Sequence, residues 1–228
     1  MKDLNSHKQP SLVAIRVECC PLCGGTEIGF YHRDVVRQYH RCTTCKLVFV
    51  PEQFHVTLER EKSEYDLHEN NCRDEGYLRF LSRFSKPFVQ QLDAGKRGLD
   101  FGCGPAPALA TLIEQHGYVV TLYDPMYKDD KSVLEKEYDF ICATEVVEHF
   151  RDPGAEFAKI FTMLLPGGWL GMMTKMVRDE AAFKTWHYIR DPTHISFYSQ
   201  ETFIYLGRKY GATVHFVEDD VIFMEKSG

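Results

Sequence analysis

The chain has 228 residues, 44% of them hydrophobic, and a formal net charge of −6 at pH 7. This length is enough for one complete α/β domain with a small appendage. No apolar stretch reaches the roughly 18 residues of a membrane-spanning helix, so a membrane partner is excluded. Residues 1–9 are polar and lack the apolar core of a signal peptide, so we expect a cytoplasmic protein whose cysteines are thiols or metal ligands.

The charge is divided unevenly along the chain. Residues 1–50 carry seven Lys/Arg and four Asp/Glu, a balance of +3, so the remainder carries 20 Lys/Arg against 29 Asp/Glu, a balance of −9. An acidic body disfavours the wrapping of a polyanion. A nucleic-acid partner therefore stays open only for the basic N-terminal part.

Two Cys-x-x-Cys pairs stand out in the N-terminal part, with 18 residues between them. Paired thiols at this separation are typical of a four-thiolate zinc site. Strand-like segments connect and follow the pairs, at residues 28–32, 39–41 and 47–50. We predict a tail over residues 1–16 and a zinc ribbon over residues 17–50, while the adjacent Cys19 is expected to be a spare thiol. The predicted zinc ligands are Cys20, Cys23, Cys42 and Cys45.

The ribbon has two possible roles. Structural zinc can stabilise a small fold that buries too little apolar surface by itself. The ribbon could instead recognise RNA or a protein partner. Zinc with four thiolates carries a formal charge of −2, which reduces the balance of +3 in residues 1–50 to about +1. The structural role is therefore favoured over an electrostatic one.

A polar connector is predicted over residues 51–64, and helical segments are predicted from Tyr65 to Leu92. Apolar residues from Tyr77 to Leu92 recur at helical spacing and indicate a face that packs on a core. The polar and aromatic stretch at residues 65–70 is either a lid over a site or a plain linker.

The sequence at the centre of the chain predicts a strand, a tight glycine turn and a helix. An apolar run ends at Asp100-Phe101, Gly102 and Gly104 follow, and a helical pattern begins at Ala108. Glycines let the backbone approach a ligand closely, and a helix start offers unpaired N–H groups. Pro107 stands where a dinucleotide fingerprint needs its third glycine, and no Walker loop follows. The turn therefore predicts a nucleotide site of another kind.

Later segments support this interpretation. An apolar run over residues 118–123 ends at Asp124, where a carboxylate can accept the hydroxyls of a ribose. A further strand is predicted over residues 138–144, followed by the sequence Glu-Val-Val-Glu-His-Phe at 145–150. A helix over residues 153–165 and a strand that includes Trp169 come next.

These motifs, in this order and spacing, resemble the class I S-adenosylmethionine-dependent methyltransferases of types 11 and 23 over roughly residues 65–225. The resemblance implies a Rossmann-like α/β sheet with helices on both faces and a helical cap before the first strand, in a domain over residues 65–228. It also implies that S-adenosylmethionine is the cofactor. Cys103 lies inside the glycine turn, where we expect an unreactive thiol. The cofactor-binding positions carried over are Asp100, Gly102, Cys103, Gly104, Asp124 and Glu145.

One segment departs from the family pattern. Only 13 residues separate Asp124 from Tyr138, whereas the family places a helix, a strand and another helix there. The intervening residues are mostly charged. We therefore expect a sheet that is one strand short, with the usual adenine contacts of that strand in doubt.

The C-terminal part supplies candidates for proton transfer. Ser199 is expected to cap a helix over residues 200–210 that ends at Gly211, before a terminal antiparallel hairpin. Imidazole titrates near neutrality, so His149 and His194 are the candidate bases, and His187 is a weaker one. Each of the two has an alternative role in packing.

The best hypothesis is methyl transfer from S-adenosylmethionine to a small-molecule or metabolite acceptor. One alternative is an rRNA or tRNA methyltransferase that uses its ribbon for recognition. Another is a cofactor-binding or zinc-ribbon interaction protein without turnover. The acidic body favours the small-molecule acceptor.

Overall fold

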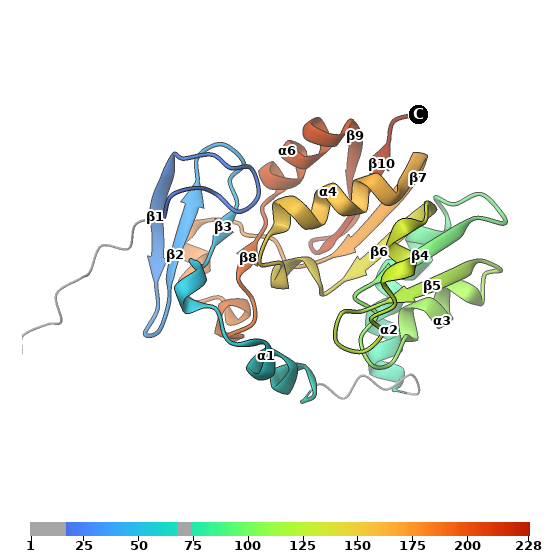
Figure 1. Cartoon of the computed structure of the whole chain (residues 1–228), viewed down its shortest axis with the longest axis horizontal. Helices are drawn as coiled ribbons and strands as arrows, with labels where there is room; N and C mark the ends of the chain where they lie inside the picture. The colour runs from blue at the N-terminus through green and yellow to red at the C-terminus, as the bar shows by residue number, and fades with distance from the viewer. Residues whose placement is uncertain (1–16, 68–73) are drawn as a thin grey trace, which may run out of the picture.

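A computed structural model describes residues 17–67 and 74–228. The predicted tail at residues 1–16 and the second half of the predicted lid lie outside the described residues. Figure 1 shows a small sheet at one end of the molecule and a larger sheet, flanked by helices, at the other. No helix within the described ranges combines the length and apolar character needed to cross a bilayer.

The larger sheet has six strands in the order β5-β4-β6-β7-β10-β9. The first four are parallel, and β10 and β9 form an antiparallel hairpin at the edge. This is the predicted mixed α/β sheet with its terminal hairpin. The strands are β4 (Arg97–Phe101), β5 (Val119–Tyr123), β6 (Tyr138–Thr144), β7 (Leu164–Met173), β9 (Ala212–Phe216) and β10 (Val221–Lys226).

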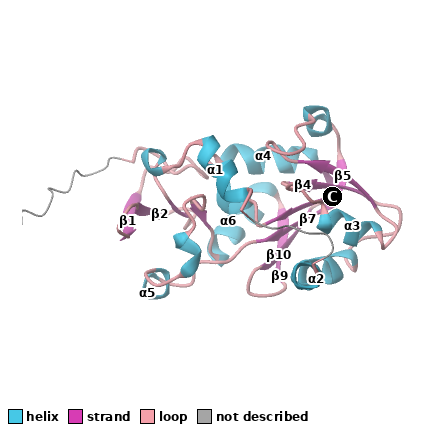
Figure 2. Cartoon of the chain, turned by 90° about the horizontal axis from the view of Figure 1, so that it is seen from below, coloured by secondary structure: helices cyan, strands magenta, loops and turns pink. Residues whose placement is uncertain are grey.

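Alternating apolar residues build a core on each face of this sheet. In β6, Phe140 and Cys142 pack on one face, whereas Ile141 and Ala143 pack on the other. Successive side chains of a strand point to opposite faces, so a strand buried on both sides is apolar throughout. Figure 2 shows α4 on one side of the sheet and α2 and α3 on the other. The covering helices are α2 (Glu75–Val89), α3 (Ala108–Glu114), α4 (Pro153–Met163) and α6 (Gln200–Tyr210).

Local capping signals fix the ends of α6. The Ser199 side chain accepts a hydrogen bond from the Thr202 backbone N–H, and the Thr202 hydroxyl accepts one from the Ser199 N–H. Gly211 then ends the helix in the left-handed region at φ 62°, where glycine is favoured. The predicted start and end of this helix are confirmed.

The small sheet contains the predicted ribbon strands and one more. Its order is β1-β2-β3-β8, and β3 pairs with β8 in the registers Val48–Phe197 and Phe49–Ser196. The last strand therefore comes from the C-terminal part of the chain and joins the ribbon to the region that carries His194. The strands are β1 (Ile28–Arg33), β2 (Gln38–Cys42), β3 (Val48–Phe49) and β8 (Ser196–Phe197).

The shortened segment after β5 holds a 3₁₀ helix, η2 (Lys131–Glu135), and a single bridge between Asp124 and Lys128. Among the described residues the larger sheet therefore ends at β5, and the prediction of a missing strand is confirmed. Thirteen residues are too few for two helices and a strand, because a strand alone takes about five.

The connector over residues 51–64 is more ordered than its polar composition suggests. It contains a 3₁₀ turn, η1 (Glu52–Phe54), and a helix, α1 (Leu58–Tyr65), whose first turn is capped by the Thr57 side chain. Helix formation therefore begins seven residues before the predicted Tyr65. The remaining short helices are η3 (Val147–His149), α5 (Glu180–Phe183) and η4 (His187–Arg190).

Candidate active site

The turn between β4 and α3 requires glycine at its first position. Gly102 has φ 84°, and a Cβ built there would lie 2.4 Å from Cγ2 of Val146. Both the conformation and the close approach therefore exclude a side chain. Gly104, at φ 62°, points its backbone N–H at Asp124, 3.0 Å from Oδ2.

Asp124 connects two loops through its carboxylate. While Oδ2 accepts from Gly104, Oδ1 accepts from the backbone N–H groups of Met126 and Tyr127 at 2.8 and 3.1 Å. An ionised carboxylate has about four acceptor positions, so Asp124, which accepts three bonds from the loops, can still accept one from a ligand hydroxyl.

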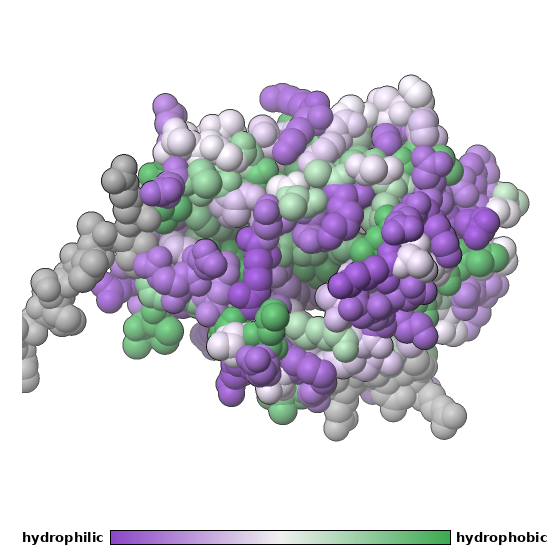
Figure 3. Space-filling view, viewed as in Figure 1, coloured by the Kyte–Doolittle hydropathy of each residue, from purple (hydrophilic) through white to green (hydrophobic). Residues whose placement is uncertain are grey.

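A cavity of about 1000 Å³ opens at the carboxyl ends of β4, β5 and β6. Ligands of open parallel sheets bind at this edge. Figure 3 shows the surface hollowed between α1 and the larger sheet, with hydrophilic side chains over most of the surrounding face. The cavity wall contains all eight residues predicted for cofactor binding and catalysis, namely Asp100, Gly102, Cys103, Gly104, Asp124, Glu145, His149 and His194.

Helix α1 closes one side of this cavity. The Tyr65 ring lies edge-on to the His149 ring at 5.1 Å between centroids. At the end of the helix, Asp66 Oδ1 accepts a hydrogen bond of 2.7 Å from the Tyr127 hydroxyl. The described part of the predicted lid, residues 65–67, thus contacts both the loop after β5 and the histidine after β6.

Asp100 is 2% exposed and lies at the cavity wall. Burial, and then the nearby Asp124 charge, raise the pKa of Asp100 to about 7, although a hydrogen bond from the Ala110 backbone opposes this. A cationic ligand group beside Asp100 would restore its charge. Burial, and then the charges of Asp100 and Asp124, raise the pKa of the Cys103 thiol to about 12. That Cys103 is unreactive stays a prediction.

We expect Asp100→Asn to stabilise the ligand-free protein at pH 8. Between about pH 4 and pH 7 the folded state binds more protons at Asp100 than the unfolded state does, so its stability falls as pH rises. Asparagine does not titrate, so the variant lacks this dependence. Its gain in free energy of unfolding over the wild type has an upper bound of about 4 kcal/mol at pH 8 and falls to nothing near pH 4. Urea unfolding across this pH range measures it. The exposed Asp219→Asn should parallel the wild type, and a parallel Asp100→Asn profile would contradict the prediction.

Glu145, directly after β6, has a strained backbone. Its φ is 54°, in the left-handed region that non-glycine residues rarely occupy, and its N–H donates to the Met173 carbonyl at 2.8 Å. Burial and the Glu148 charge raise the pKa of Glu145 to about 9, although Lys175 opposes this. Strain of this kind, held by the surrounding structure, is common at functional sites.

His149 and His194 are brought together although 44 residues separate them. Their ring centroids lie 4.8 Å apart. Burial, and then the neighbouring His149, lower the pKa of His194, so its imidazole is neutral at pH 7. His187 does not line the cavity and instead contacts Lys175, with 2.8 Å between Nε2 and Nζ.

Several residues of the site carried no predicted role. Lys175 follows β7 by two residues, at the edge of the sheet where the parallel strands end. Ligands bind at this edge, so its position after a predicted strand indicates a site residue. Tyr65 ends α1 within the predicted lid, and Asp191 follows η4; neither residue was assigned a role of its own. Tyr188 lines the cavity, whereas Tyr198 is fully buried and donates to the Val147 carbonyl.

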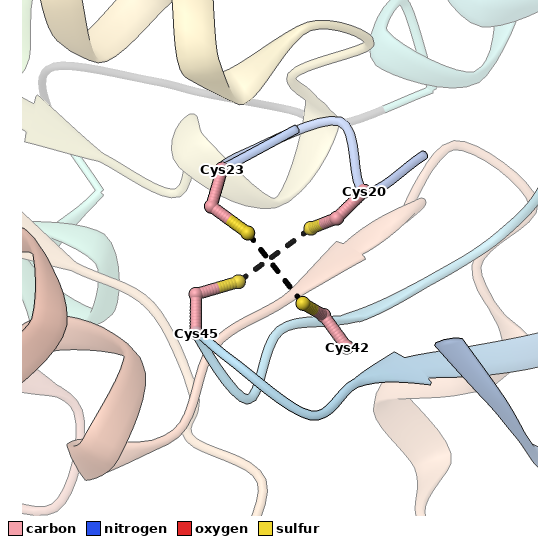
Figure 4. Close-up of side chains that lie close together, drawn as sticks. All are labelled: Cys20, Cys23, Cys42 and Cys45. Carbon is pink, nitrogen blue, oxygen red and sulfur yellow. Dashed lines mark hydrogen bonds between the residues drawn. The ribbon is translucent and has the colours of Figure 1, made fainter. Parts of the chain in front are cut away.

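The four predicted zinc ligands converge in the ribbon. Figure 4 shows their Sγ atoms pointing at one another, with 3.5 Å for both Cys20–Cys45 and Cys23–Cys42. Zinc–sulfur bonds of about 2.3 Å in a tetrahedron place sulfurs slightly less than 4 Å apart. Hydrogen bonding with Cys45 lowers the pKa of Cys20 to about 6 and raises that of Cys45 itself. Four thiolates need a cation to ionise together, so the donor set fits zinc.

Arg37, in the ribbon turn, reaches the loop that carries His194. Its guanidinium donates to the backbone carbonyls of Asp191, Pro192 and His194 at 3.0, 3.2 and 3.0 Å, and to that of Ile189. The side chain is 5% exposed. Together with the β3–β8 pairing, Arg37 fixes residues 189–197 against the ribbon.

Comparisons with known proteins agree with this geometry. The structure matches a Burkholderia thailandensis 1,6-didemethyltoxoflavin-N1-methyltransferase, solved with 1,6-didemethyltoxoflavin and S-adenosylhomocysteine bound, at TM-score 0.52 and 15% identity, covering 88% of this chain and 100% of that one. It also matches an O-methyltransferase family protein from the same organism at TM-score 0.51 and 13% identity, covering 74% of this chain and 63% of that one. At these identities the likeness shows a shared fold.

No curated protein matches the chain. A family described as a methyltransferase domain matches residues 70–216, which is more than half of the sequence. The chain therefore belongs to this methyltransferase family, and it is an enzyme of the class I methyltransferase fold.

Proposed function

We propose that this enzyme transfers the methyl group of S-adenosylmethionine to a small-molecule acceptor. The observation that carries the proposal is the cavity at the carboxyl ends of β4, β5 and β6, where the glycine turn, two buried carboxylates and two histidines share one wall. Methyl transfer from a sulfonium is an in-line displacement, so the enzyme mainly aligns the acceptor with the methyl group.

The cofactor half of the proposal rests on the turn after β4. Gly102 and Gly104 open the backbone to the ligand, and Asp124 has an acceptor position for a ribose hydroxyl. Asp100, which is buried, and Glu145, which is partly buried, are carboxyls that would gain from the cationic amino group of the cofactor. The Burkholderia thailandensis N1-methyltransferase binds S-adenosylhomocysteine on the same fold, which supports the same cofactor here.

The acceptor half rests on the size and closure of the cavity. Small-molecule pockets measure about 300–1,000 Å³, so a volume of about 1000 Å³ leaves room for a cofactor and an acceptor together. Helix α1 covers this space through Tyr65 and Asp66, and the body of the chain is acidic. These features favour a compact acceptor over RNA. His149 and His194 would stand beside it as candidate bases.

We further propose that the four-thiolate site holds structural zinc and that the ribbon, residues 17–50, supports the acceptor side of the site. The contacts of Arg37 and β8 with the loop at 189–197 support this role. The cysteines of the described segments form no disulfide, which is consistent with a reducing compartment such as the cytoplasm. The connector at 51–64 and the methyltransferase domain at 65–228 complete the proposed division of the chain.

Calorimetric titration with S-adenosylmethionine and S-adenosylhomocysteine tests the cofactor, and we expect micromolar binding. Transfer of a labelled methyl group is then followed into separated metabolite and RNA fractions of a cell extract. Label in the metabolite fraction is expected. Salt-sensitive label in RNA would instead favour the RNA alternative, binding without any transfer would favour a non-catalytic module, and no binding by the folded protein would contradict the proposal.

A further inference from the structure

Three potential metal ligands meet at the acceptor end of the cavity. Ligand atoms of Glu148, His149 and His194 all lie within 4.8 Å of one another. The first two come from η3, directly after β6, and the third comes from the loop before β8 that the ribbon holds. Within the described ranges, the four ribbon cysteines are the other such group.

Hydrogen bonds with backbone carbonyls set the orientation of both imidazoles. Nδ1 of His149 lies 3.2 Å from the Thr193 carbonyl, and Nδ1 of His194 lies 2.8 Å from the Tyr188 carbonyl. A carbonyl only accepts, so each Nδ1 carries the proton and each Nε2 keeps its lone pair. Histidines that bind metals almost always donate their other ring N–H in this way.

Glu148 supplies a carboxylate oxygen that has no partner among the described residues. Its side chain is 0% exposed, and Oε1 accepts a hydrogen bond from the Tyr188 hydroxyl, whereas Oε2 is buried and accepts no hydrogen bond from residues 17–67 or 74–228. A buried carboxylate oxygen is costly unless it is hydrogen-bonded or paired with a cation. The two imidazole lone pairs nearby are acceptors and cannot satisfy it, so the cluster lacks a positive charge.

The surroundings add to this deficit of positive charge. Asp191 Oδ2 lies 3.7 Å from Nε2 of His194, which places a second carboxylate beside the cluster. Lys175, two residues after β7, directs its ammonium to His187, with 2.8 Å between Nζ and Nε2. A divalent cation would compensate the carboxylates and use both lone pairs.

We propose that Glu148, His149 and His194 bind a divalent first-row transition-metal ion. Two imidazoles and one carboxylate are a donor set for such ions, whereas magnesium and calcium prefer oxygen ligands throughout. Ligands about 2.0–2.2 Å from one ion lie about 3–4 Å apart, so small rotations bring the three atoms into place. The binding of the ion follows from its three ligands and does not depend on the reaction. Its role toward the acceptor rests on the methyl transfer proposed above.

The ion would face the acceptor. His149 and His194 line the cavity, and the fully buried Glu148 lies behind them, so the remaining coordination positions open toward the cavity. An acceptor oxygen can occupy one of them. In this arrangement the two histidines act as ligands of the ion and not as free bases.

Electron paramagnetic resonance of added Mn²⁺ tests the site in the full-length protein with its four-cysteine site loaded with zinc. Manganese has little affinity for thiolates, so loss of the free-ion signal reports on the second group. We expect one Mn²⁺ per chain. Glu148→Gln, His149→Gln and His194→Gln should each weaken its binding at least tenfold, and the exposed, distant His116→Gln should leave it unchanged.

Calorimetry with S-adenosylhomocysteine on the same samples separates the two proposals. If the protein binds S-adenosylhomocysteine but takes up no Mn²⁺, Co²⁺ or Zn²⁺ beyond the one zinc ion of the ribbon, the metal site alone is overturned. Metal binding that survives in all three variants would also overturn it. Metal binding that these substitutions remove, without binding of S-adenosylhomocysteine, would support the metal site while contradicting the proposed function.

Discussion

Asp124→Asn is expected to weaken binding of S-adenosylhomocysteine at least tenfold. The asparagine oxygen can keep the bonds from Met126 and Tyr127, but its NH₂ group then faces the Gly104 N–H, so that two donors meet. The ribose also loses its charged acceptor. A hydrogen bond to a charged group is worth about 1.5–3 kcal/mol, so the loss of one of them accounts for a change of about tenfold or more.

Isothermal titration with S-adenosylhomocysteine measures this effect. Asp130→Asn is the matched control, because Asp130 lies in the same segment, caps η2 through Ser132 and does not line the cavity. Its affinity should equal that of the wild type. If Asp124→Asn binds within threefold of the wild type while remaining folded, the ribose does not use this carboxylate, and the cofactor lies elsewhere in the cavity.

The sequence predicts those helices and strands whose apolar pattern and end residues lie within one short segment. The strand at 138–144 has an unbroken apolar centre, residues 140–143, because both of its faces are buried there, and α6 has its start and stop signals at Ser199 and Gly211. The glycine turn and Asp124 were also recognisable, because their spacing follows from how parallel strands end at one edge of a sheet.

Features that depend on distant partners were not predictable. Strand β8 has two residues, too few for a periodic pattern, and it forms only because β3 offers a free edge. The contacts of Arg37 span more than 150 residues, and nothing near Arg37 in the sequence indicates a buried guanidinium. Glu148 had a visible position after a strand, but its unpartnered oxygen follows from the placement of Tyr188. Helix α1 is polar and largely exposed, so its apolar pattern was too weak to show its start.

Cys45→Ser is expected to remove zinc and to release the acceptor side of the site. Cys45 is 0% exposed and its Sγ lies 3.5 Å from that of Cys20. Structural zinc contributes about 10–16 kcal/mol of apparent binding free energy to small domains, so its loss should unfold the ribbon. Unfolding would free β8 and the carbonyls that Arg37 holds. We expect methyl transfer to fall at least tenfold, while the affinity for S-adenosylhomocysteine changes little because Asp124 and the glycine turn lie on the other sheet.

Four measurements on one sample decide this prediction: zinc content, hydrogen exchange over residues 189–197, methyl transfer, and the affinity for S-adenosylhomocysteine. Cys19→Ser is the matched control, since Cys19 is exposed and lies outside the cluster, and it should keep one zinc ion and full protection from exchange. Loss of zinc with unchanged exchange at 189–197 would show that the methyltransferase domain, residues 65–228, holds this loop without the ribbon. If exchange becomes faster only in residues 189–197 and the ribbon, while the affinity for S-adenosylhomocysteine is retained, the ribbon is a structural support for the loop at 189–197. The N-terminal zinc and the catalytic site would then be coupled through β8 and one arginine.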